Sequence, residues 1–103
     1  MKMKVFAKGR NDAYEAFGEY DGKSLVVKKG SRISEKISGK IQPVVTTLRN
    51  DSDTVSSEFI LLRDVEFRSP STAASFVSGT ISNGMIKWKN DAGKTLKSLT
   101  EEN

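Results

Sequence analysis

The sequence predicts a single small α+β domain, built from a mainly antiparallel sheet with two or three short helices packed on it. Three observations predict this class. Short apolar segments separated by turn residues fill the first third of the chain. A serine–proline pair and a later glycine frame a helix in the second half. The length of 103 residues suits one domain, which we place over residues 1–103.

Three strands are expected in the first 27 residues. Residues 2–8 (KMKVFAK) have an apolar centre with polar flanks, and residues 13–20 (AYEAFGEY) alternate imperfectly with a period of two. Asp21-Gly22 is a hairpin signal, and residues 25–27 (LVV) follow as the third strand. The order of strands and turns predicts an antiparallel meander.

The middle of the chain predicts a loop, a short helix and a fourth strand. Residues 32–42 are polar and rich in Ser, Lys and Gly, as a connecting loop would be. Pro43 suits the first turn of a helix over residues 43–49, and the β-branched residues there weaken that prediction. Residues 58–67 (EFILLRDVEF) alternate and predict a strand, with a break near Arg63-Asp64.

The clearest local signal is Ser69-Pro70, which predicts a helix start. The Ser69 hydroxyl can cap N–H groups of the next turn, and Pro70 has the fixed φ and the missing N–H that suit the first helical position. Gly79 is placed to end this helix.

Residues 83–100 predict a turn, a strand and a short helix. Asn83-Gly84 reads as a tight turn because both residues tolerate positive φ. Residues 85–89 (MIKWK) alternate as a half-buried strand would, with Lys87 and Lys89 on one side. Residues 95–100 are expected to form a terminal helix.

Composition excludes several classes of function. The chain has no cysteine and no histidine, so thiol chemistry, disulfides and the commonest general base and metal ligand are excluded. No motif positions a catalytic residue, a metal or a cofactor, and Gly93-Lys94-Thr95 lacks the first glycine of a phosphate-binding loop. We therefore expect no enzyme. No secretory h-region and no run of about 20 apolar residues occurs, so we expect a cytoplasmic protein without a membrane partner.

The formal net charge of +4 is unevenly spread. Residues 1–49 hold 11 Lys and Arg against 5 Asp and Glu, whereas the remaining residues hold 6 against 8. A lysine-rich solvated surface explains this, and so does a binding face for nucleic acid, because a basic face concentrates polyanions.

Several motifs together resemble a bacterial family. From Phe67 the chain reads F-x-S-P-S-x-A-A, followed by Asn83-Gly84, then Trp88-Lys89, then G-K-T-L ending at Leu96. This order is similar to a domain of unknown function often found at the C-terminus of GIY-YIG-type nucleases and restriction–modification proteins. Residues 25–99 carry the resemblance. The family is also similar to the restriction-and-adenine-methylase-associated domain.

The resemblance implies a non-enzymatic DNA-binding or targeting module in a restriction or defence context. It also leaves open a protein-interaction or assembly module that docks onto a nuclease, a methyltransferase or its own copy. Two residues depart from the family pattern: Met85 stands where a tryptophan is usual, and Lys28 where an apolar residue is usual. If that tryptophan stacks on a base, this chain has lost the contact.

Eight residues are candidate nucleic-acid contacts, and each has a structural alternative. Lysines and an arginine would hold phosphates, Trp88 would stack on a base, and Asn83 or Ser71 would supply selectivity. As alternatives, Trp88 anchors the core, Asn83 shapes a turn and the basic residues form a solvated surface. The candidates are Lys28, Lys29, Arg32, Ser71, Asn83, Lys87, Trp88 and Lys89.

Overall fold

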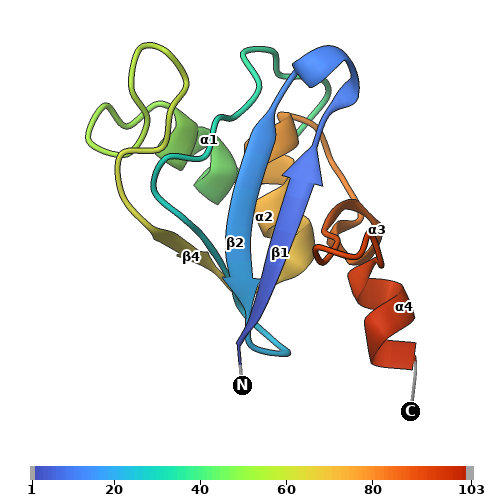
Figure 1. Ribbon diagram of the computed structural model, residues 1–103. Coiled ribbons are helices and arrows are strands. Elements are labelled where there is room, and N and C mark those ends of the chain that lie inside the picture. The colour runs from blue at the N-terminus through green and yellow to red at the C-terminus, as the bar shows by residue number, and fades with distance from the viewer. Residues whose placement is uncertain (1, 102–103) are drawn as a thin grey trace.

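A four-stranded antiparallel sheet forms the frame of the domain in the computed structural model, which describes residues 2–101 (Figure 1). The strands lie side by side in chain order: β1 (Met3–Lys8), β2 (Glu15–Tyr20), β3 (Leu25–Val27) and β4 (Val65–Phe67). A 3-10 turn, η1 (Arg10–Asp12), joins β1 to β2. The predicted α+β class and the meander of the first three strands are confirmed.

Four short helices complete the part of the domain that residues 2–101 form. Helix α2 (Pro70–Ser78) packs behind the sheet and α1 (Pro43–Arg49) packs against α2. Helices α3 (Gly84–Lys87) and α4 (Leu96–Glu101) lie on the β1 side (Figure 1). No helix within residues 2–101 is long and apolar enough to cross a membrane.

Buried and exposed side chains alternate along β1 and β2, which gives the sheet an inner and an outer face. The residues that face the helices are small or apolar and buried: Val5, Ala7, Ala16, Gly18 and Tyr20. The opposite face carries no helix among the described residues, and its side chains are exposed or half-buried. It holds three directly opposed pairs: Lys4 with Glu19, Phe6 with Phe17, and Lys8 with Glu15.

Helix α2 begins and ends at the predicted residues. The Ser69 hydroxyl accepts a hydrogen bond from the Thr72 N–H, and Pro70 occupies the first turn. Gly79 ends the helix at φ +77°, a conformation that glycine adopts without a Cβ penalty. The fully buried Phe76 lies against Phe67 of β4, with ring centroids 5.1 Å apart. The helix is thereby pinned to the inner face of the sheet.

The predicted turn at Asn83-Gly84 and the strand over residues 85–89 are wrong. Asn83 caps the one-turn helix α3 by accepting a hydrogen bond from the Met85 N–H. Glycine is needed at position 84 for close approach, because a Cβ there would lie 2.0 Å from the carbonyl carbon of Pro70. Alternation over five residues is too short to distinguish a strand from a single helical turn. The conformation of residues 84–87 is therefore determined by tertiary contacts.

The fourth strand is shorter than predicted, since only Val65–Phe67 of residues 58–67 pair with β3. Phe59 has φ +64°, which interrupts an extended run. Ile60 and Leu61 instead form isolated bridges with the loops before and after α1. The predicted helix over 43–49 is confirmed, and α4 begins one residue later than expected.

Replacing Gly79 with alanine should destabilise the domain by more than about 2 kcal/mol, because the new Cβ adds a clash to the positive φ. That Cβ would lie 2.1 Å from the Lys36 carbonyl oxygen. Gly39→Ala is the matched control: its φ of +73° is similar, but its surroundings are open. We expect a cost of about 1 kcal/mol there. Urea unfolding followed by tryptophan fluorescence measures both, and equal costs would contradict the tight contact at Gly79.

Candidate nucleic-acid interface

Three of the predicted contact residues use their side chains for hydrogen bonds within the protein. The Trp88 side chain is fully buried and its indole N–H donates a 3.0 Å hydrogen bond to the Pro70 carbonyl. The Ser71 hydroxyl accepts a hydrogen bond from the Gly84 N–H, and the Asn83 side chain caps α3. In this conformation a base has no face of Trp88 to stack on.

These bonds form one junction between α2 and α3, which we call the Trp88 junction and define as Pro70, Ser71, Asn83, Gly84 and Trp88. Its members come from the motif that suggested a family, so that motif describes how two helices meet. Met85, which stands at the position of the usual tryptophan, is half-buried against the core.

The basic residues after β3 are partly neutralised. The Lys28 ammonium lies 3.1 Å from Asp64 and 3.3 Å from Glu19, and hydrogen bonds to these carboxylates raise its pKa. The Asp64 carboxylate accepts a 2.8 Å hydrogen bond from the Lys29 N–H, which together with Lys28 lowers its pKa. Such exposed pairs contribute little energy, but they offset charge that phosphates would otherwise meet.

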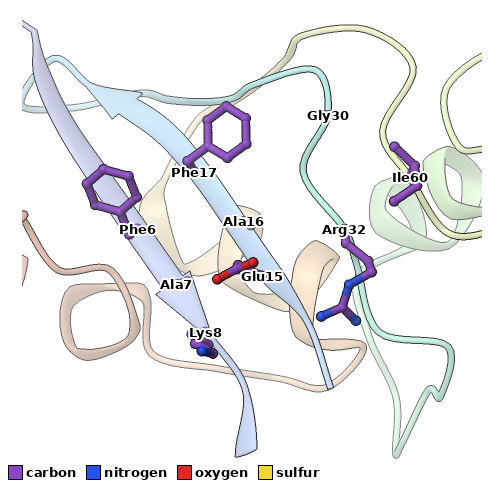
Figure 2. A pocket seen from close by; sticks show the side chains of 9 residues that line it. All are labelled: Phe6, Ala7, Lys8, Glu15, Ala16, Phe17, Gly30, Arg32 and Ile60. Atoms are coloured by element: carbon purple, nitrogen blue, oxygen red, sulfur yellow. The ribbon is translucent and has the colours of Figure 1, made fainter. Parts of the chain in front are cut away.

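Arg32 lies at the other end of the outer face. Its guanidinium is 3.9 Å from the Asp12 carboxylate and donates a 3.4 Å hydrogen bond to the Ala13 carbonyl. Its backbone bridges to Glu15 of β2 and to Ile60. Figure 2 shows Arg32 beside Glu15, with Lys8 on the other side of Glu15, on the surface that also carries Phe6 and Phe17.

Lys87 and Lys89 are brought to β1 by backbone pairing. The Phe6 N–H donates to the Lys89 carbonyl at 2.7 Å, and the Lys89 N–H donates back at 2.9 Å. Directly opposed residues of an antiparallel bridge place their side chains on the same face, so Lys89 lies beside Phe6. Lys87 and Lys89 were expected on one strand, but Lys87 ends α3 and both lysines line a hollow with Phe6 and Lys8.

Four lysines therefore surround the exposed length of β1, and we call them the basic edge: Lys4, Lys8, Lys87 and Lys89. Lys4, Lys87 and Lys89 make no ion pair with any residue in the described range 2–101, and Lys8 has an exposed 3.6 Å contact with Asp12. Asp91 lines the same hollow as Lys87 and Lys89.

Lys4, Phe6, Lys8 and Phe17 were not among the candidate residues, although the sequence carried a signal for them. In residues 13–20, Phe17 lies two positions after Glu15 and two before Glu19. In a strand these three side chains lie on the same face, so the Phe17 ring is on the charged side. Phe6 is flanked in the same way by Lys4 and Lys8. An aromatic residue on the polar parity of a strand indicates an exposed ring.

Within residues 2–101, no group of three or more carboxylates is arranged to hold a metal ion. A family model described as a domain of unknown function (DUF4357) matches residues 6–100 of the chain. The chain belongs to this family. No curated protein and no solved structure shows significant similarity to it. The predicted membership of a domain family of unknown function is confirmed at that level.

The pH titration of this DUF4357 domain should separate the two causes of the lowered Asp64 pKa. In Lys28→Ala, the Asp64 pKa should rise but stay below its ordinary value, because the hydrogen bond from the Lys29 N–H, which is the largest single cause, remains. Carboxyl NMR chemical shifts measure this. Asp21 is the internal control: its pKa is lowered by Ser24 and Lys23 N–H groups, which the substitution leaves in place.

The lowered pKa of Asp64 makes the stability of the domain depend on pH. A lowered folded-state pKa means that Asp64 stabilises the fold above its unfolded-state pKa, and this contribution disappears as pH falls through the folded-state value. An Asp64 pKa that returns fully to its ordinary value in Lys28→Ala would contradict the assigned order of causes.

The single tryptophan provides a second test. Because Trp88 is fully buried, its emission should be blue-shifted, resist quenching by acrylamide and remain unquenched when nucleic acid is added. Strong quenching by an oligonucleotide would show that the indole reaches a base, against the geometry of the Trp88 junction.

Proposed function

We propose that this domain is a non-enzymatic nucleic-acid-binding module whose basic edge holds phosphates. The observation that carries the proposal is the pairing of Lys89 with Phe6, because it gathers lysines from distant segments around one strand. Phosphate contacts from lysines supply most of non-specific nucleic-acid affinity. Lys28, Lys29 and Arg32 lie farther along the surface, and the first and last of these have acidic neighbours.

A purely binding role agrees with the composition. The chain has neither histidine nor cysteine, which are the side chains most often used for proton transfer and thiol chemistry near neutral pH. We propose that the domain itself carries out no reaction and needs no cofactor. Any chemistry on the nucleic acid would belong to a partner.

The resemblance to domains attached to GIY-YIG-type nucleases and restriction–modification proteins suggests the setting. We propose that the domain positions a nuclease or methyltransferase on DNA in the bacterial cytoplasm. Phosphate contacts would fix that position, since they carry little sequence information of their own.

A protein-docking module is the second candidate, and the exposed apolar residues near α3 favour it. Ile81 is 60% exposed and Ile86 is 49% exposed, and exposed apolar patches are typical of protein-interaction sites. A contact through them would bury apolar surface and would persist at high salt. Size-exclusion chromatography at low and high salt tests this candidate, because electrostatic complexes dissociate as salt rises.

Replacing both Lys87 and Lys89 with alanine should weaken binding to DNA and make its dependence on salt shallower. Each lost phosphate contact removes about 0.9 from the slope of log affinity against log salt for duplex, and about 0.7 for a single strand. Fluorescence anisotropy across a salt series, with and without adenine methylation of the DNA, measures both the slope and any preference for modified bases.

Lys23→Ala with Lys40→Ala is the matched control, because it removes the same charge from exposed positions outside the basic edge. We expect a smaller loss of affinity in the control than in the Lys87/Lys89 variant. Equal effects would show that only net charge matters, and would remove the basic edge from the proposal.

A further inference from the structure

We propose that Phe6 and Phe17 form an aromatic platform on which unpaired bases of a single-stranded nucleic acid stack, while the basic edge holds the strand's phosphates. This inference rests on the proposed function and names its ligand class. Aromatic side chains beside a positively charged surface are the usual means by which proteins bind single strands, because every base has a face that can stack.

The two rings are exposed side by side on the outer face of the sheet. Phe6 is 44% exposed and Phe17 is 40% exposed, and the two residues lie directly opposite each other on β1 and β2. In Figure 2 both rings stand out from the same face of the two strands. Opposed residues of neighbouring strands have Cβ atoms about 5 Å apart, and both rings line the same hollow on this face.

Backbone hydrogen bonds fix the two strand positions that carry the rings. Phe6 makes two backbone hydrogen bonds with Lys89, as described above. The Phe17 N–H donates to the Ser31 hydroxyl at 3.0 Å, and the Phe17 carbonyl accepts from the Lys28 N–H at 2.9 Å. A phenylalanine has only two side-chain torsions to restrict, so stacking on it costs little conformational entropy.

The charges around the platform give the strand an orientation. Lys89 lies beside Phe6 on the side away from Phe17, and Lys4 and Lys8 precede and follow Phe6 by two residues on the same face. Glu15 and Glu19 hold the corresponding positions around Phe17 on β2. Glu19 is offset by Lys28 and Glu15 lies beside Arg32, whereas Lys87 and Lys89 have no ion-pair partner within residues 2–101. Phosphates are therefore attracted most strongly to the β1 side, so the bases extend from the basic edge across the two rings.

This geometry favours unpaired over paired bases. In a duplex the faces of the bases are covered by their neighbours and only their edges reach a protein. Two rings on an open sheet offer faces for stacking and no hydrogen-bonding side chain that enters a groove. DNA and RNA single strands share the required chemistry, so both are included in the test.

The test compares Phe6→Leu, Phe17→Leu and the double variant with the wild-type domain. Leucine keeps an apolar side chain at an exposed strand position, so the fold should survive, and Trp88 emission and urea unfolding verify this. The probes are labelled oligothymidine, oligouridine, an abasic strand of equal length and a hairpin duplex. Fluorescence anisotropy across a salt series gives affinities and salt slopes.

We expect each substitution to lower the affinity for oligothymidine and oligouridine at least about fivefold. The salt slope should not change, because the phosphate contacts remain. The wild-type domain should bind the abasic strand about as weakly as the double variant binds oligothymidine. Ring protons of Phe6 and Phe17 should shift upfield in NMR spectra when oligothymidine binds. Val44→Ala removes another exposed apolar group, from α1, and should change none of these values.

The outcomes distinguish the inference from the proposed function. If the wild-type domain binds no probe even at low salt, the proposed function fails and the platform fails with it. If the Lys87/Lys89 variant loses affinity but the phenylalanine variants do not, phosphate binding stands and the platform is overturned. Tighter binding of the duplex than of the single strands also overturns it. So does self-association that the phenylalanine variants abolish without any effect on nucleic acid.

Discussion

The buried indole of Trp88 is the constraint on which the rest of the C-terminal half depends. Its N–H holds the first turn of α2 through Pro70, and its backbone accepts and donates hydrogen bonds that tie α4 and α3 to the same point. The next residue, Lys89, pairs with β1. A single fully buried side chain therefore determines where α3 and the lysines around it lie against the sheet.

This arrangement separates the residues that build the fold from those available for binding. Ser71, Asn83 and Gly84 use their polar groups or their lack of a side chain within the Trp88 junction. A family motif made of such residues describes a scaffold, and function lies in sites added to it. The aromatic platform and half of the basic edge come from residues before position 25, outside the motif-bearing segment.

Local chemistry explains which features were predictable from the sequence. The three meander strands, the α2 cap and the glycine that ends α2 depend on short-range rules, and all are confirmed. The conformation of residues 83–89 depends instead on contact with Pro70, which lies 18 positions before Trp88. The strand predicted there from local alternation was therefore wrong. The arrangement of the candidate residues could not be predicted for the same reason, because the burial of Trp88 and the pairing of Lys89 with Phe6 depend on long-range contacts. The exposure of Phe17, by contrast, could be predicted from its position two residues from Glu15 and two from Glu19 on the same strand.

Counting charges along the chain is a weaker guide to binding than locating them. The first half of the chain holds most of the basic residues, but Lys28 lies between two carboxylates and Arg32 lies near a third. Lys87 and Lys89 belong to the half with a net negative charge, yet they have no ion-pair partner in the part of the chain that the structure describes. Because fields from exposed charges are screened within about 10 Å, unpaired lysines beside an exposed ring matter more than the total. The position of the basic edge therefore follows from the strand pairing that Trp88 supports, and not from the overall charge.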